Sequence, residues 1–381
     1  MKKIFSILMA VTLAALSFVS CGEKKTGSSK SAMRIAMVTD SGDITDQSFN
    51  QTTYEAVKGF AEANKLDYKY YKPSGDSTEA RVSSIVQAIQ EDYNVVVLPG
   101  FLFADPLVAV VDDNKDVTFI ALDVSEWDVM EAAKNAGKTD WKLPENAFCA
   151  VYSEEIPGFF AGYAAVKEGY KHLGFLGGMA VPAVIRYGFG FVQGCNKAAE
   201  EMGIAKDVTV EYVYGGQFFG DPAITAAMDA WYGQRNVEVV FACGGGIWTS
   251  ACEAAAKVNA KVIGVDVDQS KLIDKYGEGM CVTSAMKGLA ATVNACLKSV
   301  QDGKFTAEYG AKISSLGLVS ATNPELNFVA LPTDSWSMKN FTVDQYNALV
   351  KDVFEGKVAV SNDIGAMPKV SVKVNEYPNI K

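Results

Sequence analysis

Three acidic residues stand at the ends of short apolar runs that are typical of buried strands: Asp40, Asp123 and Asp266. A single acid in such a place usually caps a helix. Three of them suggest a shared site, because the carboxyl ends of the strands in a two-lobed wound protein face a common cleft, where ligands bind. Ionised carboxylates accept hydrogen bonds from hydroxyl groups, so this pattern predicts a polar cleft suited to a polyol or a sugar.

A helix-like segment, residues 48–62, begins beside the first of these acids, with Asp46 as a candidate N-cap. Phe49 and Asn50 fall in its first turn and therefore near the same sheet edge. An aromatic ring next to an amide suggests a ligand that is both planar and polar. The alternative is that Phe49 is a hydrophobic staple and that the acids only cap the helix. The residues alone do not decide between these two interpretations.

Three consecutive glycines, residues 244–246, follow the apolar run 239–243 and precede a helix-like segment. Such a turn can bind phosphate, but it lacks the Lys-Ser/Thr of a P-loop and the glycine spacing of a dinucleotide site. The simpler interpretation is that the backbone approaches a ligand closely there. Because several acids in one cleft would repel phosphate, the pattern favours an uncharged polyol or nucleoside over a nucleotide.

The composition limits the class of protein. The chain has 381 residues, a formal net charge of -10 and no basic tract, which argues against binding to nucleic acid. Its single histidine, His172, leaves little room for Ser-His-Asp, Cys-His or H-E-x-x-H chemistry. No C-x-x-C pair is present, and we expect no metal and no cofactor. A secreted nucleoside hydrolase and a surface adhesion lipoprotein remain as alternatives to a binding receptor.

Residues 1–20 have the features of a secretion signal, with two lysines followed by the apolar run 4–19. The segment ends at Ser20-Cys21, which resembles a lipoprotein signal in which Cys21 becomes the lipidated first residue. The alternative is an ordinary signal peptide with a spare cysteine. Residues 21–32 are polar and predict a flexible tether. We therefore expect an exported protein that a lipid anchors to the cell membrane, facing the periplasm or the exterior.

Strand-like and helix-like runs alternate along the rest of the chain, which predicts an α/β protein with parallel sheets and helices on both faces. Ten strands are more than one doubly wound sheet needs, so we expect two sheets, divided near residues 169–172. The predicted strands are 34–39, 68–71, 94–98, 117–123, 147–152, 173–176, 208–214, 239–243, 262–266 and 281–283. The predicted helices after the first are 79–91, 156–168, 186–202, 223–231, 249–258 and 286–301.

Several motifs resemble, in the same order, those of the basic membrane protein family, whose members resemble purine nucleoside receptors of ABC importers. They are D-S-G-D-I-T-D-Q-S-F-N-Q at 40–51, G-G-M-A-V-P-A-V-I-R at 177–186, G-Q-F-F-G-D-P at 216–222, G-V-D-V-D-Q at 264–269 and V-T-S-A-M-K at 282–287. The resemblance implies a two-lobed type I periplasmic-binding-protein fold, with crossings between lobes near Gly169, Asp268 and Ser314. One lobe would contain residues 33–169 and about 269–313, and the other 170–268 and about 314–381.

The resemblance also implies a clamp in which two aromatic rings sandwich a purine while acids and a lysine hold the ribose hydroxyls. The ligand would be a purine nucleoside of the inosine, adenosine and guanosine class, and the partner an ABC permease. Phe219 would be the second aromatic, with Phe218 as a close competitor. Tyr187 and Trp248 depart from the usual pattern of the family. The implied ligand-binding residues are Asp40, Phe49, Asn50, Asp123, Phe219, Gly245, Asp266 and Lys287.

Overall fold

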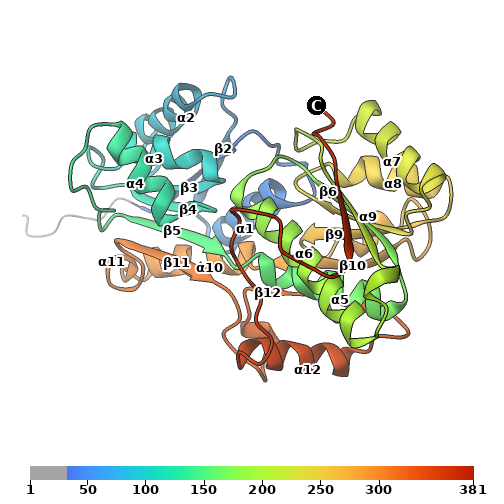
Figure 1. Ribbon diagram of the computed structural model, residues 1–381. Coiled ribbons are helices and arrows are strands. Elements are labelled where there is room, and N and C mark those ends of the chain that lie inside the picture. Colours follow the sequence, from blue (N-terminus) through green and yellow to red (C-terminus); the bar gives the residue numbers. More distant parts are fainter. Residues whose placement is uncertain (1–31) are drawn as a thin grey trace, which may run out of the picture. The chain divides into compact units, whose positions relative to one another are not determined.

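The computed structural model describes residues 32–381, and Figure 1 shows how their helices and strands are arranged. The predicted signal segment and almost all of the predicted tether, including Cys21, lie outside the described residues. The described part of the chain contains two separate sheets, each with helices on both faces.

The first sheet has six parallel strands, in the spatial order β11 (Lys312–Leu316), β5 (Ala147–Tyr152), β4 (Thr118–Leu122), β3 (Val95–Pro99), β1 (Arg34–Val38) and β2 (Asp67–Tyr71). One face packs against α2 (Thr78–Gln90), α3 (Ala104–Val110) and α4 (Glu126–Asn135). The other face packs against α1 (Phe49–Asn64), α10 (Leu289–Gln301) and α11 (Phe305–Glu308). Figure 1 shows the late strand β11 (orange) beside β5 (green). We call this sheet with its helices the first lobe.

The second sheet has seven strands, in the order β12 (Val329–Ala330), β10 (Cys281–Lys287), β9 (Lys261–Asp266), β8 (Val239–Cys243), β6 (His172–Gly177), β7 (Thr209–Tyr214) and β13 (Lys373–Glu376). Only the short β12 is antiparallel to its neighbour among these described strands. One face carries α5 (Glu155–Glu168), α6 (Pro182–Glu201) and α12 (Val343–Phe354). The other carries α7 (Pro222–Gln234), α8 (Trp248–Ala256) and α9 (Ser270–Ile273). This is the second lobe.

The predicted fold class, an α/β protein with parallel sheets between helices, is confirmed. Nine of the ten predicted strands end within one residue of the observed bounds, and the tenth, β10, continues to Lys287. The sequence prediction missed β11, β12 and β13. These strands lie at sheet edges, where some of the side chains face solvent. Such a strand mixes polar with apolar residues and shows no continuous apolar run.

The chain crosses between the two sheets at places that differ from the expected ones. Helix α5 shares a core with α6 in the second lobe, so the first crossing is at Ser153 and not near Gly169. Strand β10 pairs with β9, so the second crossing is at Gly288 and not near Asp268. The third lies between β11 and β12, close to the expected Ser314. A sequence pattern identifies a helix or strand but not the sheet on which it packs.

Helices α5 and α6 approach each other backbone to backbone. A Cβ atom on Gly158 or Gly162 of α5, or on Gly190 or Gly194 of α6, would lie under 3.0 Å from a carbonyl oxygen of the opposite helix. Small residues at a helix crossing permit this approach because no side chain keeps the two backbones apart. The crossing places the start of α5 against the second and third turns of α6. The first two turns of α6 line the ligand cavity described below.

We predict that Gly162→Ala destabilises the protein, although alanine is the better helix former. The added methyl group must displace the backbone at Phe191, and overpacking of this kind costs about 1–3 kcal/mol. Gly59→Ala in α1 is the matched control, because a Cβ there meets no atom within 4 Å. It should stabilise by about 0.5–1 kcal/mol. Urea unfolding of both variants measures the two effects, and a neutral Gly162→Ala would contradict the close packing.

Candidate ligand-binding site

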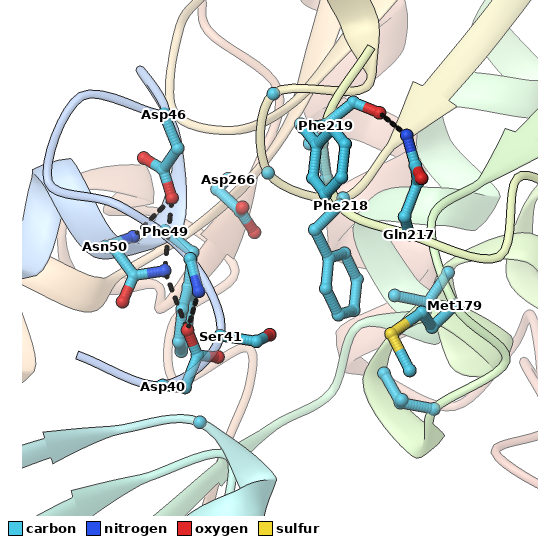
Figure 2. A pocket seen from close by; sticks show the side chains of 18 of the residues that line it. Asp40, Ser41, Asp46, Phe49, Asn50, Met179, Gln217, Phe218, Phe219 and Asp266 are labelled. Atoms are coloured by element: carbon cyan, nitrogen blue, oxygen red, sulfur yellow. Dashed lines mark hydrogen bonds between the residues drawn. The ribbon is translucent and has the colours of Figure 1, made fainter. Parts of the chain in front are cut away.

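A cavity of about 770 Å³ lies between the carboxyl edges of the two sheets, and residues of both lobes line it. All eight side chains or backbone positions predicted from the sequence are among its lining residues: Asp40, Phe49, Asn50, Asp123, Phe219, Gly245, Asp266 and Lys287. Figure 2 shows the labelled side chains facing the space between the lobes. The structure therefore brings the predicted residues together, although they are spread over more than half of the chain.

The backbone turns sharply where two of the strands end. Asp123 directly follows β4 with φ 59°, and Asp266 ends β9 with φ 66°. The left-handed region is unfavourable for most residues, but Asp tolerates it better than bulky or β-branched side chains. These two turns stop the strands at the cavity, which leaves both carboxylates at its wall.

The ammonium group of Lys287 joins carboxylates of both lobes. Its Nζ donates to Asp123 Oδ2 of the first lobe at 2.7 Å. It also donates to Glu154 Oε1 of the second lobe at 3.3 Å and lies 3.9 Å from Asp266 Oδ1. Glu154 Oε2 accepts a further hydrogen bond from Arg186 Nε at 2.6 Å. Lys287, Glu154 and Asp266 are all buried.

Burial would lower the pKa of Lys287, but the charges of Asp123, Glu154 and Asp266 outweigh it and raise the pKa above the ordinary value. The lysine is therefore positively charged at physiological pH. Burial raises the pKa of Asp123 to about 6, while the Lys287 ammonium opposes this shift and the charge of Glu154 adds to it. The second oxygen of Asp123, Oδ1, is buried and has no hydrogen-bond partner among the described residues.

Aromatic rings enclose the same ammonium group. Lys287 Nζ lies 4.7 Å from the ring centroid of Phe49, 5.3 Å from that of Tyr152 and 5.9 Å from that of Tyr187. The attraction between the ammonium and these rings adds to its attraction to the carboxylates. The rings themselves keep water away from the charged groups. The Tyr187 side chain is buried near Asp266, and burial and the charge of Asp266 raise its pKa.

A second polar cluster lies at the start of α1. Asn50 Nδ2 donates to Asp40 Oδ1 at 3.1 Å and to Asp46 Oδ2 at 3.2 Å, as Figure 2 shows. Burial raises the pKa of Asp40 and raises that of Asp46 to about 6. Ser48, not Asp46, is the residue at the helix N-cap, yet the Asp46 carboxylate accepts from the backbone N–H groups of Ser48, Asn50 and Gln51. Asp46 therefore binds backbone N–H groups at the start of the helix, as a cap does, but it lies two residues before the N-cap position.

Phe218 and Phe219 lie on a loop of the second lobe, across the cavity from Phe49 (Figure 2). Phe219 is 61% exposed. Phe218 is more enclosed, because its ring packs where glycines at 178 and 244 leave room for it. Gly245 has φ 52° and lies against the Phe218 carbonyl, and Gly246 N donates to that carbonyl at 2.7 Å. The glycine turn thus supports the aromatic loop and lines the cavity itself.

The loop before α1 also bonds directly to the second lobe. Ser48 Oγ donates to Asp266 Oδ2 at 2.5 Å, and Gln269 Nε2 donates to the Gln47 carbonyl at 2.9 Å. Trp248 Nε1 lies 3.5 Å from the Asp46 carbonyl. These bonds hold the two lobes together on one side of the cavity.

Several residues of this site were missed from the sequence: Glu154, Ser48 and Gln269 as direct bonding partners, and Tyr152 and Tyr187 as enclosing rings. Glu154 follows the end of β5, so the rule that found Asp40, Asp123 and Asp266 would have found it too. His172 lies elsewhere, with its Nε2 2.9 Å from Glu211 Oε1. The six cysteines of the described chain are buried free thiols.

Residues 33–328 match the family model described as "ABC transporter substrate-binding protein PnrA-like". The chain belongs to the Bmp family. This family consists of ABC-transporter substrate-binding proteins, which bind a small-molecule ligand outside the cytoplasm and deliver it to a permease. The resemblance stated from the motifs is thereby confirmed. Among the described residues, none of the helices is both long and apolar enough to span a bilayer.

Named relatives align with more than four-fifths of the chain. The "ABC transporter nucleoside-binding protein BmpA" of Lactococcus lactis is 25% identical over 94% of this chain and 99% of its own length. "Basic membrane protein B" of Borreliella afzelii is 24% identical over 83% of this chain and 90% of its own. A solute-binding protein of an ABC transporter system from Aeropyrum pernix matches with a TM-score of 0.65 at 19% identity, covering 86% and 87% of the two chains. This structural likeness shows the fold of a solute-binding protein.

We predict that Lys287→Met lowers the free energy of unfolding by about 3–5 kcal/mol at pH 8, because it leaves buried carboxylates without their cation. The loss of the ammonium also raises the pKa of Asp123 above about 6. An acid whose pKa is higher in the folded than in the unfolded state stabilises the fold at low pH, and this contribution disappears as the pH rises through the folded value. The deficit should therefore be smaller at pH 5 than at pH 8.

Urea unfolding at the two pH values measures this difference. Lys134→Met on the exposed side of α4 is the control, since that side chain is 75% exposed. It should change stability little at either pH. Deficits of Lys287→Met that are equal at pH 5 and pH 8 would contradict the assigned coupling between the lysine and Asp123.

Proposed function

We propose that this protein captures purine nucleosides for an ABC importer. The base would lie between Phe49 and Phe219, and the ribose would contact Asp123, Asp266 and Lys287. The observation that carries the proposal is the pairing, within one cavity, of aromatic rings on opposite lobes with a charged cluster of acids and one lysine. A planar base with a hydroxyl-bearing sugar matches both halves of this arrangement.

The aromatic half favours a flat ligand. Phe49 comes from the first turn of α1 and Phe219 from the opposite lobe, so a ring placed between them would have both faces covered. Phe219 is the more available of the two adjacent phenylalanines, because it is 61% exposed. Offset stacking of a base on such rings is favourable and tolerates different bases, which suits a receptor for several purines.

The charged half favours a diol. Asp123 has one buried oxygen without a partner, so it offers an acceptor to a ligand hydroxyl. Lys287 is a donor only, and it can hold a second oxygen of the same sugar. A hydrogen bond to an ionised group contributes about 1.5–3 kcal/mol, so a few of them together with stacking are enough for tight binding.

The balance of charge favours a nucleoside over a nucleotide. Asp40, Asp46, Asp123 and Asp266 line the cavity. The two lysines among its described lining residues, Lys72 and Lys287, are already paired with acids. A phosphate group would meet more negative than positive charge there. The Lactococcus lactis relative is named as a nucleoside-binding protein, which agrees with this assignment.

We also propose that the protein binds without turnover and that a lipid on Cys21 holds it at the cell membrane. The single histidine lies away from the cavity lining, and the acids and the lysine of the charged half are paired with each other. The Ser20-Cys21 step after an apolar run supports the anchor.

Calorimetric titration with inosine, adenosine, guanosine, cytidine and inosine monophosphate tests the function. The purine nucleosides should bind tightly, and the monophosphate much more weakly. Chromatography of the same mixtures after incubation should show no free base. Failure to bind any purine nucleoside would overturn the proposal, and repeated release of free base by a preparation free of contaminants would favour a hydrolase.

We predict that Phe49→Ala and Phe219→Ala each weaken purine nucleoside binding by about 1–3 kcal/mol, the contribution of one base–aromatic stack. Phe219→Ala should leave the melting temperature of the ligand-free protein nearly unchanged, because its ring is largely exposed. Phe49 packs partly against a core, so its truncation should also cost some stability. Calorimetry and ligand-free melting curves measure both effects.

Phe218→Ala is the matched comparison for the neighbouring ring. If Phe219 stacks on the base, Phe218→Ala should lower stability more than affinity, since its ring fills the space over the glycine turn. A large loss of affinity in Phe218→Ala with none in Phe219→Ala would transfer the stacking role to Phe218. Unchanged affinity in all three variants would exclude the sandwich.

For the anchor, we predict that Cys21→Ser moves the protein from the membrane fraction to the soluble fraction of cells. The buried acyl chains supply the membrane affinity, at about 0.8 kcal/mol for each CH₂ group, so removal of the lipidated residue should abolish the association. Fractionation followed by a salt wash and immunoblotting measures it. A Cys21→Ser protein that stays with the membrane after the wash would contradict the lipid anchor.

A further inference from the structure

The three crossings between the lobes lie against one another. Ser153 N donates to the carbonyl of Leu316 at 3.0 Å, and Gly288 N donates to that of Phe328 at 2.7 Å. Phe328 N in turn donates to the Gly317 carbonyl at 3.0 Å. The third crossing is thus bonded to both of the others, and we call this connection between the lobes the hinge.

Two residues of the charged cluster flank this hinge in sequence. Glu154 directly follows the first crossing, and Lys287 directly precedes the second. Glu154 has no exposed surface and does not line the ligand cavity. One of its oxygens accepts from Lys287 and the other from Arg186, at 3.3 and 2.6 Å.

We infer that Glu154 is a positioning residue that holds the Lys287 ammonium in the cavity wall, where the proposed function requires it. The partners of Lys287 differ in the lobe from which they come. Asp123 belongs to the first lobe, whereas Glu154 and Asp266 belong to the second, as does Lys287 itself. Of the two within the second lobe, only Glu154 lies within hydrogen-bond distance.

The lobe assignment explains why the lysine needs this partner. Two-lobed binding proteins open and close about a hinge, and opening moves the first lobe with Asp123 away from the second. Glu154 stays with Lys287 in either state, because both belong to the second lobe. A lysine side chain has four rotatable bonds, so a fixed acceptor inside its own lobe keeps it directed at the cleft before ligand arrives.

The competing explanation is that Glu154 only neutralises the buried Arg186. The two explanations differ in what happens when both charges are removed. If Glu154 only neutralises Arg186, combining Glu154→Gln with Arg186→Gln removes both charges. The double variant then binds inosine as the wild type does. If it positions Lys287, the double variant regains stability but not affinity, since the acceptor for the lysine is still weakened.

Glu155 provides a matched control. It is the next residue, also a buried glutamate, but its Oε2 has no hydrogen-bond partner among the described residues and it does not line the cavity. Glu155→Gln makes the same chemical change one position along the same helix turn. It should leave the affinity for inosine unchanged.

The experiment measures inosine affinity by calorimetry and the Lys287 ammonium by ¹H–¹⁵N correlation spectra of the ligand-free protein. The lysine signal is assigned by its loss in Lys287→Met. Glu154→Gln should weaken inosine binding by at least roughly tenfold, the loss of about one charge-assisted hydrogen bond. The slowly exchanging ammonium signal should disappear in Glu154→Gln and persist in Glu155→Gln.

Wild-type affinity in Glu154→Gln, or full recovery of affinity in the double variant, would overturn the inference. Persistence of the ammonium signal in Glu154→Gln would also overturn it. Should the wild-type protein fail to bind inosine, the proposed function fails, and the ligand-free spectra alone then decide whether Glu154 positions Lys287. If Glu154→Gln alone does not fold, the same spectra are recorded on the double variant, in which the ammonium signal should also be absent.

Discussion

The structure depends most on the burial of one ammonium group, that of Lys287, between two lobes. Removing such an ion from water costs several kcal/mol, and only close carboxylates and hydrogen bonds offset this cost. Asp123 reaches the lysine from the first lobe and Glu154 from the second, with Asp266 just beyond hydrogen-bond distance. The ends of β4, β5 and β9 must therefore meet at one point, which defines both the cleft and the hinge beside it.

That arrangement determines which groups of a ligand the proposed site can bind. Acids that neutralise a lysine keep part of their hydrogen-bonding capacity, as the unpartnered Oδ1 of Asp123 illustrates. The same ammonium lies over the face of Phe49, so the aromatic and charged halves of the cavity are in contact. A ligand with a flat ring joined to a diol would engage both halves, while the surrounding acids would repel phosphate.

Much of this could be predicted from the sequence, since strand-end acids, a first-turn aromatic and a glycine turn are local patterns. Asp40, Asp123 and Asp266 could be assigned to a common cleft because each stands at the end of an apolar run. The lobe to which α5 and β10 belong could not be predicted, because it depends on glycine contacts with α6 and on pairing with β9. Glu154 follows the end of β5, so its position could have been predicted as those of the other strand-end acids were. Its pairing with Lys287 could not, because that depends on the lobe to which β10 belongs.

The most direct test of the account is a comparison of inosine with 2′,3′-dideoxyinosine by calorimetric titration. The two ligands share the base and differ only in the hydroxyls that the acids and Lys287 would hold. Two lost charge-assisted hydrogen bonds correspond to a decrease in affinity of at least about a hundredfold. We predict that decrease. Equal affinity for the two ligands would contradict the assignment of the charged cluster to the ribose.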